Sequence, residues 1–487
     1  MTDHSPRSTY FEKLVRIFSS SLRELNASPS HMQVERMSII VLESMSQKSR
    51  EFHSVQHIFD VCEGSTDPIL ILSSIFHDIV YVQVDQIITP EQAKVLGPAI
   101  ETNSSICCDT GQLITEVRLN RLQNDDVYVS LVTSIFGLKL KRQVLPSSGI
   151  NEFLSALIAI NSLKDLLDIG TLAQIAACIE STIPFRNDSP HLKLLERLKK
   201  VNHEFSLGLS SCDITKSVQR AVELANRDVD NFASNDLGTF LSHTWTLLPE
   251  TNMSLRYNLY KFHEYQLAMR RILNFFTTLD AENIFASFHD IPDRNKLKTI
   301  VDRAEKNLQL GTMYIKVKLL TMSMFAALAE LTGGDCSIIV FLGDFRSDSK
   351  RFSHEFAEKV KLYMPDYKAR KDKMIKKGDV RDEVYNLLEV GRNEDSSWDQ
   401  KQSPVSAFLY VFLGNSGIDE GLNKVVYPTN TESAKALLQS LPKIIVLIIA
   451  HSAGEFIVTR KDALIKLVDN INFNKHWTDN MLKEVHV

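Results

Sequence analysis

Cysteine is scarce in this sequence and is not arranged in pairs. The 487 residues include six cysteines, at positions that form no CxxC pair and no regular spacing. A disulfide scaffold and a thiolate zinc site both need such pairs, so the pattern argues against both. The scarcity fits a reducing compartment, and we expect a cytoplasmic location.

The chain also lacks a long apolar run and a large excess of charge. Its most apolar stretch, IIVLIIA at 444–450, is too short to cross a bilayer, which takes about 20 residues. The first residues, MTDHSPRSTYFEK, carry acidic and polar side chains where an export signal has an apolar core. A formal charge of −5, from 55 basic and 60 acidic residues, gives no general attraction to nucleic acid. We therefore expect neither a membrane nor a nucleic acid as partner.

The composition is that of a soluble folded protein, with 44% apolar and 24% charged residues. At this length two domains are expected. In residues 1–285 apolar positions recur at spacings of three and four, which predicts a mainly helical domain. After a long helix that ends at Gly333 come the runs SIIVFLG, AFLYVFLG and KIIVLIIA, each of which fits a buried strand or a buried helix. The predicted class is mainly all-α, with residues 286–487 forming a C-terminal module, helical or α/β, of unknown role.

Histidines gather in two short segments near the N-terminus. The stretch FHSVQH at 52–57 contains two histidines four residues apart, and IFHDIVY at 75–81 contains a third that is followed by an aspartate. Between them, Asp67 is a good N-cap and Pro68 suits the first position of a helix, while Gly64 can end the helix before it. The pattern predicts a helical hairpin that brings together His53, His57, His77 and Asp78.

These four side chains are suited to hold a divalent cation. Histidines four apart lie on one face of a helix, so they can share a metal or divide the roles of ligand and acid. His77 and Asp78 follow an apolar helix, where an ionisable pair is costly unless it is paired or bound to a metal. Imidazole and carboxylate groups together suit zinc, manganese, iron or magnesium and do not choose among them. The alternative is that the histidines are hydrogen-bonded core or surface residues.

A further acid is available in the segment SVQRAVELANRDVDNFA. If this segment is helical, Asp228 falls in line with Leu224 and Phe232 on the apolar face, and Asp230 falls on the polar face. Asp228 is therefore the predicted buried acid and the fourth metal ligand. A helix cap or a structural hydrogen bond is the other interpretation of this residue.

Together these segments resemble the HD superfamily of metal-dependent phosphohydrolases. The order FHSVQH, FHDIVY, NEFLSAL at 151–157 and IESTIPF at 179–185 is similar to that of a predicted bacterial branch with YHxxxH, FHDxVY and NExxSA elements. The first element also resembles that of the cyclic-nucleotide phosphodiesterases. The likeness covers about residues 45–235, with Phe52 in place of the usual Tyr and no histidine after IESTIPF. It implies an all-helical fold, hydrolysis of a phosphoester, and a divalent metal bound by His57, His77, Asp78 and a distant Asp.

The resemblance also assigns roles around the metal. His53 matches the general acid of the phosphodiesterases, and the substrate is a small phosphomonoester or phosphodiester, with a nucleotide-like compound favoured. Glu152 lines up with Ala156 on an apolar helix face, so it can orient a ligating histidine or make a structural hydrogen bond. Arg50 and Arg227 flank the predicted site and can meet substrate phosphate, although a place on the surface is the usual alternative for arginine.

Two other classes of function stay open. If the site is vestigial, the chain is an HD-like scaffold whose C-terminal module binds protein partners. If IIVLIIAHSAGEF is a strand followed by a helix, it is close to the GxSxG elbow of serine hydrolases, with Ser452 as the nucleophile and Asp469 and His476 as available partners. The basic run from Lys368 to Lys377 is followed at once by acids, which indicates a solvated helix face or a linker.

Overall fold

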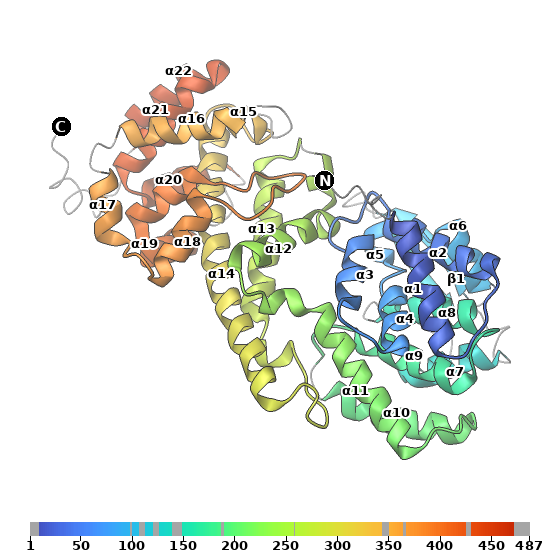
Figure 1. The fold of residues 1–487 in the computed structure, drawn as a ribbon. Helices are drawn as coiled ribbons and strands as arrows, with labels where there is room; N and C mark the ends of the chain where they lie inside the picture. The colour runs from blue at the N-terminus through green and yellow to red at the C-terminus, as the bar shows by residue number, and fades with distance from the viewer. Residues whose placement is uncertain are drawn as a thin grey trace, which may run out of the picture. The chain divides into compact units, whose positions relative to one another are not determined.

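The computed structural model divides the chain into two compact units (Figure 1). The first unit consists of Met1–Ala233 and Asp280–Asp302, and the second of Ser234–Leu279 and Arg303–Val487. The structure describes residues 9–97, 100–106, 113–119, 126–138, 149–186, 189–257, 259–342, 350–363, 367–424 and 430–471.

This division differs from the sequence-based boundary at 285. Residues 234–279 belong to the second unit, where the ring of Trp245 stacks on that of Trp398 with centroids 6.1 Å apart. The hydroxyl of Tyr260 donates a 2.6 Å hydrogen bond to the carbonyl of Trp398. These partners are far apart along the chain, so no local pattern in the sequence predicts that they are in contact.

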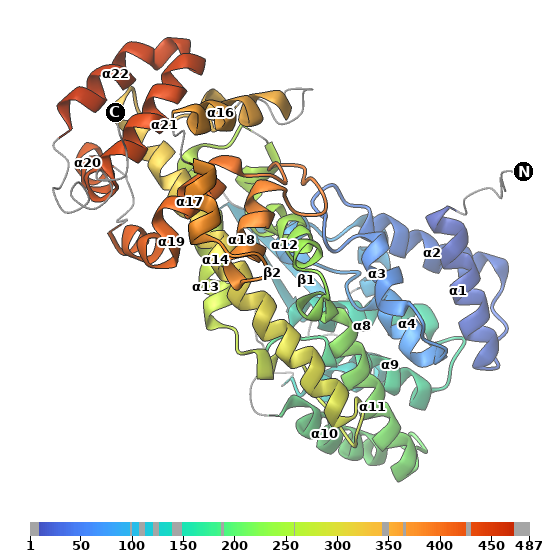
Figure 2. The same cartoon turned by 60° about the vertical axis from the view of Figure 1, so that its left-hand side comes forward.

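The described residues of the first unit form a helical bundle with one β-hairpin, whose strands are labelled in Figure 2. Strands β1 (Ile100–Ile106) and β2 (Leu113–Leu119) pair antiparallel, with Ile100 opposite Leu119. The sequence analysis did not predict this hairpin. The helices of the unit are α1 (Tyr10–Glu24), α2 (His31–Met45), α3 (Val55–Cys62), α4 (Pro68–Phe76), α5 (Val82–Asp85), α6 (Pro90–Leu96), α7 (Val127–Phe136), α8 (Ile150–Leu163), α9 (Ile169–Ser181), α10 (Pro190–Glu204), α11 (Ser211–Asp228) and the short 3-10 turns η3 (Asp230–Ala233) and η5 (Ala281–Asn283).

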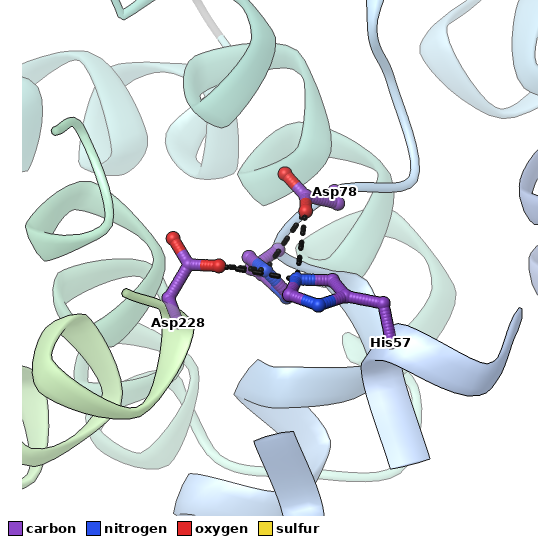
Figure 3. A group of neighbouring side chains, drawn as sticks. His57, Asp78 and Asp228 are labelled. Atoms are coloured by element: carbon purple, nitrogen blue, oxygen red, sulfur yellow. Dashed lines mark hydrogen bonds and ion pairs between the residues drawn. The ribbon is translucent and has the colours of Figure 1, made fainter. Parts of the chain in front are cut away.

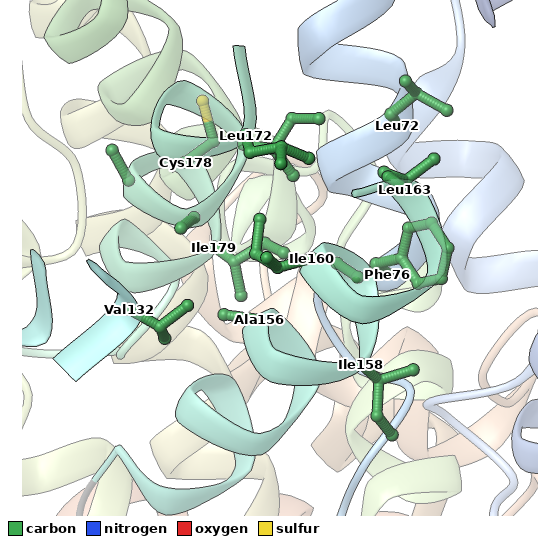
Figure 4. Close-up of a cluster of buried hydrophobic side chains, with 14 of the residues drawn as sticks. Leu72, Phe76, Val132, Ala156, Ile158, Ile160, Leu163, Leu172, Cys178 and Ile179 are labelled. Atoms are coloured by element: carbon green, nitrogen blue, oxygen red, sulfur yellow. The ribbon is translucent and has the colours of Figure 1, made fainter. Parts of the chain in front are cut away.

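Helix α9 is the core helix of this bundle. It packs against α4, α7, α8, α10 and α11, and every residue from Leu172 to Glu180 is buried. Figure 4 shows Leu172 and Ile179 of α9 in one apolar cluster with Ile160 of α8 and Phe76 of α4. A helix that is apolar on all sides has to be enclosed in this way. The packing fixes α4, and with it the polar residues that follow its last turn.

The predicted hairpin of α3 and α4 is present. Asp67 caps α4, since its Oδ1 accepts hydrogen bonds from the backbone N–H groups of Ile69 and Leu70, and Pro68 is the first helical residue. Gly64 follows α3 with φ of 72°, a conformation that glycine adopts without strain. One detail of the prediction is wrong: α3 begins at Val55, so His53 lies in the bend before the helix and does not share a helical face with His57.

In the second unit every regular element of the described residues is helical. The described parts of the apolar runs SIIVFLG, AFLYVFLG and KIIVLIIA lie mostly in the helices α15 (Ile339–Leu342), α19 (Pro404–Lys424) and α21 (Lys443–Phe456) and contain no strand. The open choice between strand and helix is therefore decided for helix. The chain is therefore mainly all-α, as predicted. The helices are α12 (Leu237–Thr251), α13 (Phe262–Thr278), α14 (Arg294–Leu331, which begins in the first unit), α15 (Ile339–Leu342), α16 (Lys350–Leu362), α17 (Tyr367–Met374), α18 (Val380–Glu389), α19 (Pro404–Lys424), α20 (Thr431–Ser440), α21 (Lys443–Phe456) and α22 (Lys461–Asn470), with 3-10 turns η4 (Met253–Tyr257) and η6 (Val458–Arg460).

A buried ion cluster holds the loop between α18 and α19. Asp399 Oδ2 accepts hydrogen bonds from Lys318 Nζ at 2.6 Å and from Trp245 Nε1 at 2.7 Å. The guanidinium of Arg392 lies over the Trp245 ring, 4.4 Å from its centroid. The loop is thus attached to α12 through Trp245 and to α14 through Lys318.

Helix α14 is long and apolar enough, by length and composition, to cross a membrane. In the described residues, 83% of its apolar window is buried inside the protein, as in a core helix of a soluble protein. The pair α20 and α21 passes the same test only if it is counted as one span, and it is bent by 120°.

Candidate metal centre

Four side chains of the first unit converge on one point (Figure 3). His57 comes from α3, His77 and Asp78 follow α4, and Asp228 is the last residue of α11. His57 Nε2 and His77 Nε2 each lie 3.2 Å from Asp228 Oδ1. Asp78 Oδ2 lies 3.0 Å from His77 Nε2 and 3.5 Å from His57 Nε2. One ligand atom from each of the four residues therefore lies within 4.8 Å of all the others.

The cluster is largely withdrawn from solvent. The side chain of His77 is fully buried, that of His57 is 10% exposed, and those of Asp78 and Asp228 are each 16% exposed. Burying ionisable groups is costly unless opposite charges or a cation compensate them. The apolar packing of α4 against α9 imposes this burial.

Hydrogen bonding fixes the orientation of the His77 ring. Its Nδ1 lies 2.7 Å from the carbonyl oxygen of Ser74, so Nδ1 carries a proton and donates it to that carbonyl. In the neutral ring, Nε2 then presents its lone pair to Asp78 and Asp228. Metal-binding histidines are commonly held in this way, with the other ring nitrogen bonded to a backbone carbonyl.

One carboxylate oxygen of the cluster has no hydrogen-bond donor. Asp78 Oδ2 is buried and, among the described residues, receives no hydrogen bond, although two imidazole nitrogens lie close to it. A buried anionic oxygen without a donor is costly, and a cation would satisfy it.

Without a metal, the carboxylates favour protonated imidazoles. Burial, the largest single effect, lowers the pKa of His57, but its hydrogen bond to Asp228 and the nearby negative charge of Asp78 outweigh burial and raise the pKa to about 9. Burial likewise opposes the shift at His77, yet the negative charge of Asp78 raises the pKa of this histidine well above its ordinary value. Burial raises the pKa values of Asp78 and Asp228, but the positive charge of His77 outweighs this effect, and both pKa values are lowered.

The distances suit a divalent cation. Bonds of about 2.1 Å from metal to ligand put neighbouring ligand atoms about 3.0 Å apart around an octahedral ion and about 3.4 Å apart around a tetrahedral one. Four of the six separations between the ligand atoms, at 3.0, 3.2, 3.2 and 3.5 Å, lie close to these values, and the other two are within 4.8 Å. Two imidazoles and two carboxylates fit zinc, manganese or iron, and magnesium less well because it prefers oxygen ligands.

His53 lies beside the cluster but outside the ligand set. Its Nε2 is 4.0 Å from Asp78 Oδ2, and its side chain is 15% exposed. The ring packs edge-on against Tyr81 and Phe52, with centroids 4.7 and 4.9 Å away. A histidine in this place can meet a ligand that approaches the cluster.

Glu152 lies in the first turn of α8, where burial raises its pKa to about 7 with a smaller contribution from the negative charges of Asp78 and Asp228. The proposal that it orients a ligating histidine is not supported at His77, because Ser74 holds the Nδ1 of that ring.

The two arginines predicted to meet substrate phosphate are both paired with other groups of the protein. The Arg50 side chain is fully buried and paired with Asp85 at 2.6 Å. Arg227 pairs with Glu223 and donates hydrogen bonds to the carbonyls of Val61 and Glu63 at the end of α3. The full burial of Arg50 argues against contact with substrate. Arg227 is 26% exposed, and its contact with substrate phosphate stays a prediction.

The side chains that hold the turn after His77 were not predicted from the sequence. Ser155 Oγ accepts a hydrogen bond from the backbone N–H of Val80, and Asn151 Oδ1 accepts one from Val82. Gln92 Nε2 donates to the carbonyl of Ile79 at 2.7 Å. The spacing of Asn151 and Ser155, four apart on α8, was the available signal, since it puts two hydrogen-bonding groups on one helix face.

Ser452 does not form a nucleophile elbow. It lies inside helix α21, and the residues directly before it, from Lys443 on, belong to the same helix rather than to a strand. Its Oγ is buried and has no hydrogen-bond partner among the described residues. Of the predicted partners, His476 and the side chain of Asp469 lie outside the described part. The arrangement contradicts a serine hydrolase centred on Ser452, because an elbow requires an exposed hydroxyl on a strand-to-helix turn.

Comparison with known proteins gives no relative: no family model, no curated protein and no solved structure matches this chain.

Proposed function

We propose that the first unit is an HD-type metal-dependent phosphohydrolase acting on a small phosphomonoester or phosphodiester, with a nucleotide-like compound favoured. The observation that carries the proposal is the convergence of His57, His77, Asp78 and Asp228, which come from three separate segments, on a point where a divalent cation fits. The order of motifs in the sequence supports the choice of phosphoester chemistry.

In this proposal the four ligands set the place of the reaction. When bound, a divalent cation offsets the negative charge of phosphoryl oxygens and makes water more acidic. The oxygen of a water molecule bonds to phosphorus while the ester P–O bond breaks. His53 protonates the leaving oxygen, because it lies next to the ligands, is not one of them, and keeps some exposure. Glu152 is the candidate to take up the proton that the water loses, since its pKa of about 7 allows this near neutral pH.

The experiment compares metal binding and phosphoester hydrolysis in two matched variants. The parent protein is expected to bind one Mn²⁺ and to hydrolyse p-nitrophenyl phosphate or bis-p-nitrophenyl phosphate. Asp78→Asn should lose both properties, because it removes a charged ligand. Asp60→Asn is the control, since Asp60 is an exposed acid of α3 that bonds to Gln56, and it should keep both.

The outcomes separate the remaining classes. Metal binding without hydrolysis of any phosphoester tried would favour the vestigial scaffold. Hydrolysis that survives Asp78→Asn would contradict the proposal.

A further inference from the structure

The buried ion pair of Arg50 and Asp85 adjoins the candidate metal centre without belonging to it. The guanidinium of Arg50 meets the Asp85 carboxylate with Nε at 3.0 Å from Oδ1 and Nη2 at 2.6 Å from Oδ2. Ser49 Oγ donates a further hydrogen bond to Asp85 Oδ1 at 2.8 Å. The exposed fractions of the two charged side chains are 0% and 3%. The pair is therefore rigid and shielded from water.

What distinguishes this pair is where the remaining guanidinium donors point. Arg50 Nη1 donates a 2.6 Å hydrogen bond to the backbone carbonyl of Asp78, and Nη2 lies 3.4 Å from the carbonyl of Ile79. Asp78 is one of the four ligands of the candidate metal centre. A single side chain thus holds the backbone of a ligand while its own charge is balanced on the other side by Asp85.

Stability alone is a weak reason for such a pair. Replacing a buried ion pair by apolar side chains of similar volume is often neutral or stabilising, because the desolvation of both charges offsets their attraction. Arginine does provide something that apolar groups do not: a planar fork of donors that can bind a carboxylate and a carbonyl at once.

We infer that Arg50, oriented by Asp85, is a positioning residue that sets the place of the Asp78 carboxylate and so determines how tightly the centre binds a divalent cation. This inference rests on the proposed function. Ser155 and Asn151 hold the N–H groups of Val80 and Val82, so the turn is fixed downstream of Asp78. Arg50 fixes its beginning. Without the guanidinium, the partly buried carbonyl of Asp78 lacks this donor. The peptide then rotates to find another donor, which moves the carboxylate.

The test is the dissociation constant of Mn²⁺, measured by electron paramagnetic resonance titration of the full chain with Mn²⁺ alone. Arg50→Lys keeps the charge, but an ammonium group cannot reach Asp85 with two donors and the Asp78 carbonyl with a third. We expect Mn²⁺ to bind about 10- to 100-fold more weakly, the usual effect of removing a partner that orients a ligand. Asp85→Asn, which keeps the volume and removes the charge, should weaken binding in the same direction.

The matched control is Arg186→Lys. Arg186 also pairs with a buried carboxylate, that of Glu180, and donates to backbone carbonyls, but its described contacts include no residue of the turn after His77. The dissociation constant of Mn²⁺ for this variant should lie within about twofold of the parent value, because substitutions at distant sites have little effect on one another.

The outcomes keep this inference apart from the proposed function. If the parent binds no Mn²⁺, the metal centre itself is contradicted. If the parent binds one Mn²⁺ and folded Arg50→Lys binds it equally well, only the positioning role is overturned. Should Arg50→Lys not fold, as judged by circular dichroism, Asp85→Asn decides in the same way.

Discussion

Each unit of this protein contains a buried cluster of charged side chains, and the two clusters are built on opposite plans. In the second unit one acid, Asp399, is surrounded by donors: Lys318 and Trp245 bond to it, and Arg392 lies over the Trp245 ring. In the first unit one possible ligand atom from each of two acids and two imidazoles lies in a common space, and Asp78 Oδ2 receives no hydrogen bond from the described residues.

The difference shows that burial of charge is not in itself a sign of function. The Asp399 cluster supplies its own cations and attaches a loop, so nothing has to be added to it. In the other cluster the acceptors outnumber the fixed positive charges, and the arrangement is balanced only by protons or by a metal. A candidate binding site is therefore distinguished from a structural cluster by the convergence of several possible metal ligands that have no cation among them. Burial alone does not distinguish the two.

The largest effect is expected from a substitution that removes a ligand of the candidate metal centre in the first unit. His77→Ala removes a fully buried ligand, and we expect complete loss of bound Mn²⁺ and of phosphoester hydrolysis. Metal content after dialysis against Mn²⁺ and an assay of the same sample check both. His203→Ala, on the outer helix α10, is the control and should change neither. Retention of one bound Mn²⁺ by His77→Ala would contradict the ligand set.

Removing His53 should separate binding from turnover. Because His53 Nε2 stands 4.0 Å from Asp78 Oδ2 and outside the ligand set, His53→Ala is expected to keep Mn²⁺. Hydrolysis should fall about 10²- to 10⁴-fold, the usual contribution of a general acid. Steady-state kinetics with saturating Mn²⁺ measures this. Loss of metal together with activity would show that the roles of His53 and His57 are exchanged.

The second cluster is broken by Lys318→Met. This change leaves Asp399 buried with one cation fewer, and removing one partner of a buried pair typically costs about 3–5 kcal/mol of stability. Urea denaturation of the full chain should therefore shift to lower concentration. Mn²⁺ binding by the first unit should not change, and its loss would mean that the two clusters are not independent.

The pH dependence of metal binding gives a smaller, graded effect. The pKa of His57 in the metal-free protein is raised to about 9, so this imidazole carries a proton at neutral pH that a metal must displace. The affinity for Mn²⁺ should increase as pH rises towards 9, by about tenfold per pH unit for each proton released. Titration at several pH values in buffers of different ionisation enthalpy measures this, and an affinity that is flat between pH 6.5 and 9 would contradict it.

The same shift predicts how the metal-free protein responds to pH. Since the folded-state pKa of His57 is raised, the stability that its protonation contributes is fully present below the ordinary pKa of 6.5 and is lost as pH rises through about 9. Thermal denaturation with a chelator should follow this course. His57→Asn should reduce this dependence, and the part that remains belongs to His77, whose pKa is raised in the same direction. A dependence that is unchanged in the variant would contradict the role given to His57.

Local signals in the sequence were sufficient for the hairpin that carries the site. Asp67 and Pro68 mark the start of α4, Gly64 marks the end of α3, and the apolar face of α11 identifies Asp228 rather than Asp230 as the buried acid. Each of these inferences depends on neighbours within one or two helical turns. Such short-range patterns predict the structure correctly here because the start, the end and the buried face of a helix depend mainly on residues within the helix or next to it.

The parts that were missed depend on partners far along the chain. The Arg50 side chain is buried because it pairs with Asp85, 35 residues later, and donates a hydrogen bond to the carbonyl of Asp78. The periodicity of the sequence does not reveal such a pairing. His53 lies outside α3 because the helix begins only at Val55; Ser54 occupies the N-cap position without a side-chain capping hydrogen bond. The run before Ser452 was ambiguous because short apolar runs fit a buried helix as well as a strand.

The most direct test of the metal centre is anomalous diffraction from a crystal soaked in Mn²⁺, recorded on both sides of the manganese absorption edge. The account predicts a single strong peak about 2.1 Å from His57 Nε2 and His77 Nε2 and within bonding distance of Asp78 and Asp228. An ordered, solvent-filled space with no anomalous peak among these four side chains would contradict it.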